Sequence, residues 1–297
     1  MDICVFGAGS LGTLIGGLLA DAHDVTLVGR RPHVDAIESD GLRLTGECNR
    51  TVTLEARTDP PGSADLAVVT VKSFDTDVAA RELAGVDLKY ALSLQNGMGN
   101  EARLASYLEC PVLAGTCTYG ARLSEPGVVE CTGIGDVACG ARTGGPSAVA
   151  DQVGEAFAAT GLDTVVSTEM PRKLWEKLAI NAGINAATAL ARVPNGALVD
   201  SPAEAVTRKA ARETARVARD NGVELETAQA VETTLSVAEA TAPNTSSMLQ
   251  DIESERRTEI DAINGYVVDQ AEEAVPVNET LTSLVRTWET ERGLRGE

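Results

Sequence analysis

The feature of this sequence that most constrains its fold is a Gly-x-Gly-x-x-Gly hexapeptide at residues 7–12. A β-type apolar run, Ile3–Phe6, comes directly before it, and a helical pattern, Leu11–Ala20, follows. A second β-type run, Val25–Val28, completes a strand–helix–strand unit of about thirty residues. The hexapeptide alone is a weak signal, but this context favours a dinucleotide-binding loop over a glycine-rich turn that binds nothing.

Each glycine of the hexapeptide has a distinct expected role. Gly7 permits the tight turn, Gly9 lets the backbone approach a pyrophosphate, and Gly12 lets the helix pack closely on the strand. The pyrophosphate would lie at the helix N-terminus, where unpaired N–H groups and the helix dipole favour an anion. We therefore expect cofactor contacts from the whole loop: Gly7, Ala8, Gly9, Ser10, Leu11 and Gly12.

The residues after the second β-type run indicate which dinucleotide binds. An NAD site favours an acidic residue there, whereas this chain has Gly29-Arg30-Arg31. Because a guanidinium can pair with a 2′-phosphate, the sequence predicts NADP; the alternative is that both arginines simply face solvent. Lys72 and Asn96 follow later β-type runs and would reach the same ligand-binding edge, unless they are a solvated lysine and a turn asparagine.

The remaining sequence predicts two domains, an α/β doubly wound domain at residues 1–168 and an all-helical domain at 169–297. Apolar runs without alternation, which are typical of a covered parallel sheet, occur at Ile3–Phe6, Val25–Val28, Leu66–Val71, Ala91–Leu94 and Val112–Ala114. Gly127–Ala141 predicts antiparallel strands at the sheet edge. Helices are expected at Arg172–Ala191, Ala203–Asn221, Glu226–Ala240, Ser246–Glu253, Thr258–Ala274 and Glu279–Arg292.

Composition excludes several classes of partner. The net charge is −19 with no evident basic face, so we expect no nucleic-acid binding. No apolar run is long enough for a membrane span, and the first residues do not resemble a signal peptide, so we expect a cytoplasmic protein. The six cysteines and two histidines lack metal-ligand spacing, which predicts no metal and cysteines that act as small buried hydrophobes. The acid excess with only five lysines is typical of a halophilic-type acidic surface; the alternative is ordinary solubility through charge.

Candidate catalytic residues emerge in the second half. No histidine follows residue 33, and no tyrosine has a lysine four residues later, so a lysine is the leading proton donor for a carbonyl reduction. Lys177, Asn181 and Asn185 are spaced to share one helix face among apolar neighbours. Because buried asparagines without partners cost stability, the stripe suits a ligand-binding face, where partial burial would lower the pKa of Lys177. A solvated lysine above two interhelical asparagines is the alternative.

Two further segments could bind a small acid. Residues 244–252 offer hydroxyls and amides at a helix start, which could receive a carboxylate or simply cap the helix. Glu259 could orient the lysine or the substrate, or could be an ordinary acid early in a helix.

Taken together, these motifs resemble the ketopantoate reductase (2-dehydropantoate 2-reductase) family over nearly the whole chain. The stretches that carry the resemblance are Gly7–Gly12, Val71-Lys72, Asn96–Gly99, Leu174–Asn181 with Asn185, Pro194–Gly196, Ser246–Ile252 and Thr258–Gly265.

The resemblance implies a role for each matching position. Lys177 corresponds to the proton donor, and Asn181, Asn185 and Asn195 correspond to substrate-binding amides. Cofactor contacts are implied for Arg30, Lys72, Asn96, Ala121 and Glu259, of which Asn96 would also meet the substrate, and Glu259 would lie near both molecules. The segment that receives the substrate is implied to be Ser247, Met248, Leu249 and Gln250. The implied reaction reduces ketopantoate with NADPH to (R)-pantoate, a step towards coenzyme A.

Some readings stay open. A related reductase of another 2-oxo acid would use the same helix stripe, and an NADP-binding sensor would need no proton donor. A hydroxyacid or phosphoglycerol dehydrogenase would share the architecture but lack the Pro194–Gly196 and Ser246–Ile252 combination. Either Arg30 or Arg31 could hold the 2′-phosphate, and Tyr119 is large enough to alter access near the nicotinamide. The helical half also offers surfaces for a homodimer.

Overall fold

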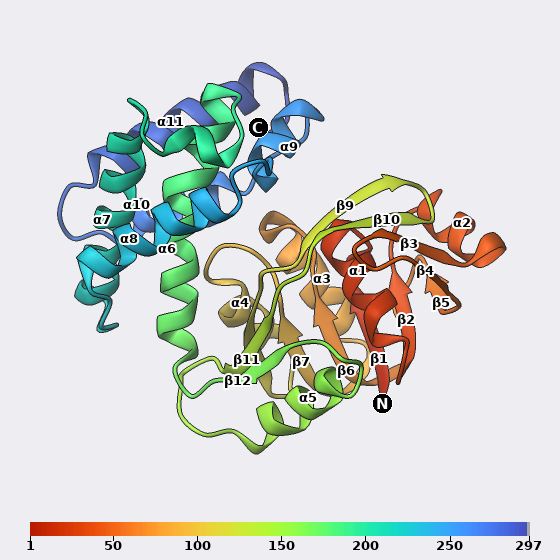
Figure 1. Cartoon of the computed structure of the whole chain (residues 1–297). Helices are drawn as coiled ribbons and strands as arrows, with labels where there is room; N and C mark the ends of the chain where they lie inside the picture. The colour runs from red at the N-terminus through yellow and green to blue at the C-terminus, as the bar shows by residue number, and fades with distance from the viewer. Residues whose placement is uncertain (296–297) are drawn as a thin grey trace. The chain divides into compact units, whose positions relative to one another are not determined.

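The computed structural model describes residues 1–295, which form two compact units (Figure 1). Residues 1–95 and 99–170 form an α/β unit, and residues 96–98 group with the segment from 171 onwards in a helical unit. The predicted fold class, a mixed α/β domain followed by an all-helical one, is confirmed. Residues 96–98 were expected within the first domain, but they lie with the helical unit.

The main sheet of the α/β unit has eight strands in the order β12-β11-β8-β7-β6-β1-β2-β5. Neighbours from β5 to β8 are parallel, and β11 is antiparallel to β8. The strands are β1 (Asp2–Phe6), β2 (Asp24–Val28), β5 (Glu55–Arg57), β6 (Ser63–Val69), β7 (Asp87–Ser93), β8 (Val112–Cys117), β11 (Val137–Ala141) and β12 (Thr164–Val166). All five predicted parallel strands are therefore present.

Both faces of this sheet are buried, which explains why its strands read as continuous apolar runs. Along β1, Ile3 and Val5 belong to one hydrophobic cluster, while Cys4 and Phe6 belong to another on the opposite face. The first cluster includes side chains of α1 (Ser10–Leu19) and α5 (Ala148–Ala158), and the second includes side chains of α3 (Thr76–Leu83) and α4 (Asn100–Tyr107). Burial raises the pKa of the Cys4 thiol to about 12, which suits its predicted role as a small hydrophobe.

A second sheet, β4-β3-β10-β9, covers α1 on the side away from the main sheet. Its strands are β3 (Leu42–Gly46), β4 (Arg50–Val52), β9 (Gly120–Glu125) and β10 (Val128–Gly133), and α2 (His33–Asp40) precedes β3. The prediction of edge strands over 127–141 was partly wrong. Both strands do have antiparallel neighbours, β9 for β10 and β8 for β11. Neither lies at the edge of its sheet, however: β11 lies next to the edge strand of the main sheet, and β10 also pairs in parallel with β3, which buries Val129 and Cys131 in the cluster around α1.

The helical unit is built around one long helix, α6 (Met170–Ala191). Small residues let its neighbours approach closely: a Cβ on Gly183 would lie 2.8 Å from the Thr234 side chain of α8. The other elements are η2 (Asn195–Leu198), α7 (Glu204–Asp220), α8 (Thr227–Ala240), α9 (Ser247–Glu253), η3 (Ile260–Ala262), α10 (Asn264–Asp269) and α11 (Pro276–Glu291). Among residues 1–295, none of the helices combines the length and the apolar character that a bilayer span requires.

One predicted helix, Thr258–Ala274, was wrong as a single element. The segment forms the short turn η3 and then α10, and the break falls at Ile263, whose backbone (φ −107°, ψ −95°) is not helical. Hydrogen bonds to Glu289 and Met98, both distant in sequence, fix the backbone around this break.

Candidate functional site

The glycine loop is a tight backbone turn fixed from two sides. Gly7 and Ala8 both donate their N–H groups to Val28 O, at 3.0 and 2.9 Å. Gly7 has φ +117°, a conformation that favours glycine, and a Cβ there would lie 2.7 Å from Val71 N. The predicted tight turn at Gly7 is therefore required by the structure.

Gly12 closes the loop against its own first residue. A Cβ at Gly12 would lie 2.1 Å from Gly7 O and 2.3 Å from the Thr70 hydroxyl oxygen. Thr70 also donates its hydroxyl hydrogen to Gly7 O at 2.9 Å. Any side chain at position 12 would thus push the start of α1 away from the strand edge.

In contrast, the middle glycine faces open space. A Cβ on Gly9 would meet no atom of the described residues within 4 Å, although Gly9 is the residue at the N-terminus of α1. The first turn of α1 carries no acidic residue, and no side chain caps it. This open backbone cradle at a helix N-terminus fits the pyrophosphate of a dinucleotide.

The Ser10 side chain has a structural role. Its Oγ accepts the backbone N–H of Leu123 at 3.0 Å, which ties β9 to the start of α1. Ala121 lies on the same strand, two residues from this contact. Tyr119 packs against the cluster around α1, where burial raises the pKa of its phenol.

The two arginines after β2 differ in their surroundings. Arg31 forms an ion pair with Asp35, one turn along the chain. Arg30 is exposed, and its guanidinium has no hydrogen bond or ion pair within residues 1–295. Arg30 is thus the one that is available to a phosphate.

Lys72 follows β6 at the same edge of the sheet, at the start of the short turn η1 (Ser73–Asp75). A buried polar network supports this segment. Gln95, only 3% exposed, donates its amide hydrogens to Val71 O at 3.1 Å and to the Thr76 hydroxyl at 2.7 Å. Thr76 in turn bonds Asn100 Oδ1 at 3.0 Å.

Asn96 contacts Glu259 within the helical unit. Its Nδ2 donates to Glu259 Oε2 at 3.5 Å, and Glu259 is only 5% exposed. The neighbouring Met98 N–H donates to Ala262 O at 3.0 Å. Gly97 must lack a side chain, because its φ is +79° and a Cβ would lie 2.5 Å from Ala262 Cβ. Asn96-Gly97 is therefore more than a simple turn, because the hydrogen bond from Asn96 connects two predicted site residues, Asn96 and Glu259.

The predicted polar stripe lies on α6. Lys177 and Asn181 are partly buried, and Asn185 is only 6% exposed. The side-chain amides of Asn181 and Asn185 make no hydrogen bond with any residue between 1 and 295. These two amides therefore leave donors and acceptors that a ligand can use.

The stripe leads to the start of α9. Thr188, one turn beyond Asn185, shares a hydrogen bond with the Ser246 hydroxyl at 2.8 Å. Ser246 also accepts the Leu249 N–H at 3.2 Å and so caps α9, which leaves Ser247 as the first helical residue with a partly exposed side chain.

Asn195 lies on the neighbouring turn η2. Its Nδ2 donates to the Thr241 hydroxyl at 2.9 Å. Its Oδ1 is buried without a hydrogen-bond partner in the described part of the chain. This unused acceptor fits the predicted role of Asn195 as a substrate amide.

The remaining residues of the predicted substrate segment serve other purposes. The side chains of Met248 and Leu249 are 1% and 3% exposed and lie in the hydrophobic cluster of the helical unit. Their backbone groups are what these two residues could offer to a ligand. Gln250 donates its side-chain amide to Thr245 O at 3.0 Å and braces the start of α9.

Comparison with known proteins assigns the family. Residues 3–144 match the family model described as "Ketopantoate reductase PanE/ApbA", and residues 169–289 match its C-terminal counterpart, "Ketopantoate reductase PanE/ApbA C terminal". The chain belongs to the ketopantoate reductase family. A 2-dehydropantoate 2-reductase of Halobacterium salinarum is 44% identical over 96% of this chain and 98% of that protein.

Solved structures agree with this assignment. A PanE/ApbA family ketopantoate reductase from Ralstonia eutropha JMP134 covers 99% of this chain and 100% of its own, with 35% identity and a TM-score of 0.90. A D-mandelate dehydrogenase in complex with NADH and anilino(oxo)acetate covers the same shares with a TM-score of 0.93, but at 24% identity it shows the fold alone. Membership in the ketopantoate reductase family confirms the resemblance seen in the sequence and the expected NADP-dependent oxidoreductase class.

Sequence reasoning missed several residues that support the family's site motifs. Thr70, Gln95 and Thr188 are buried or half-buried polar side chains, and each hydrogen-bonds a predicted site residue or an immediate neighbour of one. Gln95 directly precedes Asn96, and Thr188 continues the α6 stripe one turn further, so spacing alone could have indicated these two. Nothing in the local sequence marks Thr70, since its contact with Gly7 joins residues far apart in the chain.

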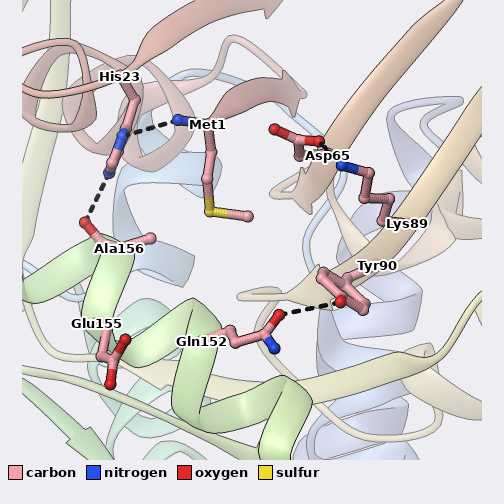
Figure 2. Close-up of a pocket in the computed structure, with 8 residues that line it drawn as sticks. All are labelled: Met1, His23, Asp65, Lys89, Tyr90, Gln152, Glu155 and Ala156. Carbon is pink, nitrogen blue, oxygen red and sulfur yellow. Dashed lines mark hydrogen bonds and ion pairs between the residues drawn. The ribbon is translucent and has the colours of Figure 1, made fainter.

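A cavity of about 470 Å³ lies elsewhere on the α/β unit (Figure 2). It is lined by Met1, His23, Asp65, Lys89, Tyr90, Gln152, Glu155 and Ala156. Several lie near the amino ends of β1, β6 and β7, the sheet edge opposite the glycine loop, and none is a predicted site residue. Lys89 pairs with Asp65 at 2.6 Å, and His23 links the Met1 amine to Ala156 O, so these groups hold β1, β6, β7 and α5 together (Figure 2).

Proposed function

We propose that this protein catalyses the NADPH-dependent reduction of ketopantoate (2-dehydropantoate) to (R)-pantoate, a step towards pantothenate and coenzyme A. The observation that carries the proposal is the polar face of α6. Lys177, Asn181 and Asn185 follow at four-residue spacing, and the nearly buried Asn185 amide has no partner within residues 1–295. Such a face, combined with the family assignment, fits a small polar substrate better than a packing surface.

The α/β unit offers the groups that an NADPH molecule needs. The open backbone at Gly9 and the uncapped N-terminus of α1 suit the pyrophosphate. Arg30, whose guanidinium is unpaired within residues 1–295, suits the 2′-phosphate better than Arg31, which already pairs with Asp35. We assign further cofactor contacts to Lys72, Asn96, Glu259 and the backbone of Ala121.

Bound NADPH supplies the hydride that reaches the carbonyl carbon. The protonated Lys177 ammonium donates a hydrogen bond to the carbonyl oxygen and stabilises the negative charge that develops there. It then delivers its proton to that oxygen as the general acid. No histidine lies in the helical unit, so lysine is the residue there that best suits this task.

Amides and a hydroxyl position the substrate in this proposal. Asn181, Asn185 and Asn195 bind its polar groups, and Asn195 contributes the buried oxygen that lacks a partner in the described residues. The Ser247 hydroxyl, at the start of α9, receives the carboxylate with the adjacent backbone N–H groups. Fixing a reactant in this way supplies a large share of the rate in enzymes.

Three finer features belong to the same proposal. The absence of a bilayer-spanning helix among residues 1–295 and a biosynthetic role are consistent with a cytoplasmic location. The net charge of −19 and the low number of lysines support an acidic surface adapted to high salt. A homodimer through the helical unit is the assembly that we propose.

The test is an assay of NADPH oxidation with ketopantoate and a panel of other 2-oxo acids, in high KCl and with NADH alongside. Faster turnover of ketopantoate than of any other acid is the expected result. Turnover of a different acid alone would keep the mechanism and replace the substrate. If the protein binds NADPH but turns over none of the acids, it is an NADP-binding sensor and the proposal is wrong.

A further inference from the structure

The loop that carries Glu259 is held by the C-terminal end of the chain. Glu289, on the last turn of α11, is fully buried. Its Oε1 accepts two hydrogen bonds from Thr258, one from the backbone N–H and one from the hydroxyl, both at 2.7 Å. The residue directly before Glu259 is therefore attached to α11 at two points.

The other side of Glu259 is fixed through the same threonine. Thr258 Oγ accepts the N–H of Ile260 at 3.2 Å, so the residues before and after Glu259 are joined in a closed turn. Thr258 and Ile260 are almost completely buried, at 1% and 0% exposed. The backbone of Glu259 consequently has little freedom to move.

Arginines complete the attachment. Arg295 donates to Glu289 Oε2 and, at 2.6 Å, to Asp261 Oδ2, while Arg286 donates to Asp261 Oδ1 at 2.7 Å. Burial raises the pKa of Asp261, but the hydrogen bonds from these two arginines outweigh it and hold that pKa below its ordinary value. The carboxylate of Asp261 therefore stays ionised and paired, two residues from Glu259.

The turn at residues 258–262 also fixes the position of Asn96. Glu259 accepts from Asn96 Nδ2, and Ala262 O accepts the N–H of Met98 at 3.0 Å. A displacement of residues 258–262 would move both partners of the segment 96–98. Two residues that we assign to cofactor and substrate thus depend on one buried carboxylate at the end of α11.

From this arrangement we infer that Glu289, braced by Arg295, is a positioning residue that sets the location of the Glu259 carboxylate and, through it, of Asn96. The inference rests on the proposed function, in which Glu259 and Asn96 meet cofactor and substrate. In this role Glu289 acts through Thr258 and, together with Arg295, through Asp261, and not by contact with cofactor or substrate.

The test compares Glu289→Gln with Glu213→Gln, because the two carboxylates hold opposite ends of the same helix. Glu213 accepts the N–H groups of Val277 and Asn278, at 3.1 and 3.0 Å, at the start of α11. We expect Glu289→Gln to lower kcat/KM for ketopantoate by roughly tenfold, less than the ~10²-fold that a misplacement of about 1 Å can cost. Glu213→Gln should destabilise the fold to a similar degree and leave kcat/KM near the wild-type value. An equal kinetic loss in both variants would mean that Glu289 only stabilises α11.

A double-mutant cycle shows whether Glu289 acts through Glu259. Glu259→Gln alone should reduce kcat/KM, and adding Glu289→Gln to it should cost little more. Thr258→Ser, which keeps the hydroxyl, should retain activity, whereas Thr258→Val should behave like Glu289→Gln. Additive losses at positions 259 and 289 would overturn the inference.

Failure of the proposed function can be distinguished from failure of the positioning role of Glu289. If the wild type reduces another 2-oxo acid, the same cycle is measured with that substrate. If it reduces none, amide hydrogen exchange decides: Glu289→Gln should speed exchange at Ile260 and Met98, and Glu213→Gln should not. Unchanged exchange at both amides in Glu289→Gln would overturn the positioning role whatever the substrate.

Discussion

The backbone N–H of Gly127 donates to Nδ1 of His33 at 3.0 Å, deep inside the α/β unit. Because Nδ1 accepts this hydrogen bond, the proton of the neutral ring must sit on Nε2, which bonds the Thr13 hydroxyl at 3.1 Å. The imidazole is only 6% exposed and joins α1, α2 and the β9–β10 turn. A second proton on this ring would break the bond to Gly127.

His33 should therefore make the stability of the protein fall in mild acid. Burial lowers the pKa of His33 below its ordinary value of 6.5, so the unfolded chain binds a proton more readily than the folded one. The free energy of unfolding should decrease as pH falls below about 6.5. His33→Gln, which can still accept and donate, should flatten this dependence between about pH 6.5 and 5. Urea unfolding at several pH values, at fixed KCl concentration, measures the pH dependence of the free energy of unfolding. An identical pH dependence in His33→Gln would contradict the role given to His33.

Lys177→Ala should reduce kcat by about 10²- to 10⁴-fold, the contribution typical of a general acid. The affinity for NADPH should change little, since the groups assigned to the pyrophosphate and the 2′-phosphate lie at Gly7–Gly12 and Arg30. Steady-state kinetics and fluorescence titration of NADPH separate the two effects. The matched control is Lys209→Ala, which removes the same charge from an exposed position on α7 and should leave kcat unchanged. Normal turnover in Lys177→Ala would refute the role of Lys177 as proton donor.

Arg30→Ala should weaken the binding of NADPH far more than the binding of NADH, because only NADPH carries the 2′-phosphate. A hydrogen bond to a charged group is worth about 1.5–3 kcal/mol, so the NADPH dissociation constant should rise roughly ten- to a hundredfold. Arg31→Ala is the matched control: its guanidinium already pairs with Asp35, and the expected change is small. If Arg31→Ala has the larger effect, the 2′-phosphate is bound by Arg31 instead.

Local patterns in the sequence were enough to predict the main sheet. The runs around Ile3–Phe6 and Leu66–Val71 are apolar on both faces, and that property alone identifies strands of a covered parallel sheet. The second sheet could not be predicted in this way. β3 and β10 become neighbours only when distant segments meet over α1, with Leu44 paired to Val129, and no local signal encodes that pairing.

The same distinction holds for the candidate site. Lys177, Asn181 and Asn185 could be found by spacing, because a single helix fixes their relative positions. The region after Thr258 could not, since Glu289 and Met98 attach to it from distant parts of the chain and break the predicted helix. Spacing also does not show that the side chain of Met248, within the segment 247–250 that the resemblance assigns to the substrate, lies in the hydrophobic cluster of the helical unit.

The glycine loop allows a direct comparison of two substitutions that look alike in sequence. Gly12→Ala should destabilise the fold by at least about 1–3 kcal/mol, because its Cβ would lie 2.1 Å from Gly7 O, a backbone atom that cannot move aside. Gly9→Ala should leave the stability of the protein nearly unchanged, since no described atom lies within 4 Å of its Cβ. The added methyl group would instead occupy the space that we assign to the pyrophosphate, so NADPH affinity should fall by tenfold or more, roughly the energy of one charged hydrogen bond. Thermal unfolding and NADPH titration of both variants test this. A stable Gly9→Ala protein with wild-type affinity would show that the pyrophosphate does not contact this loop.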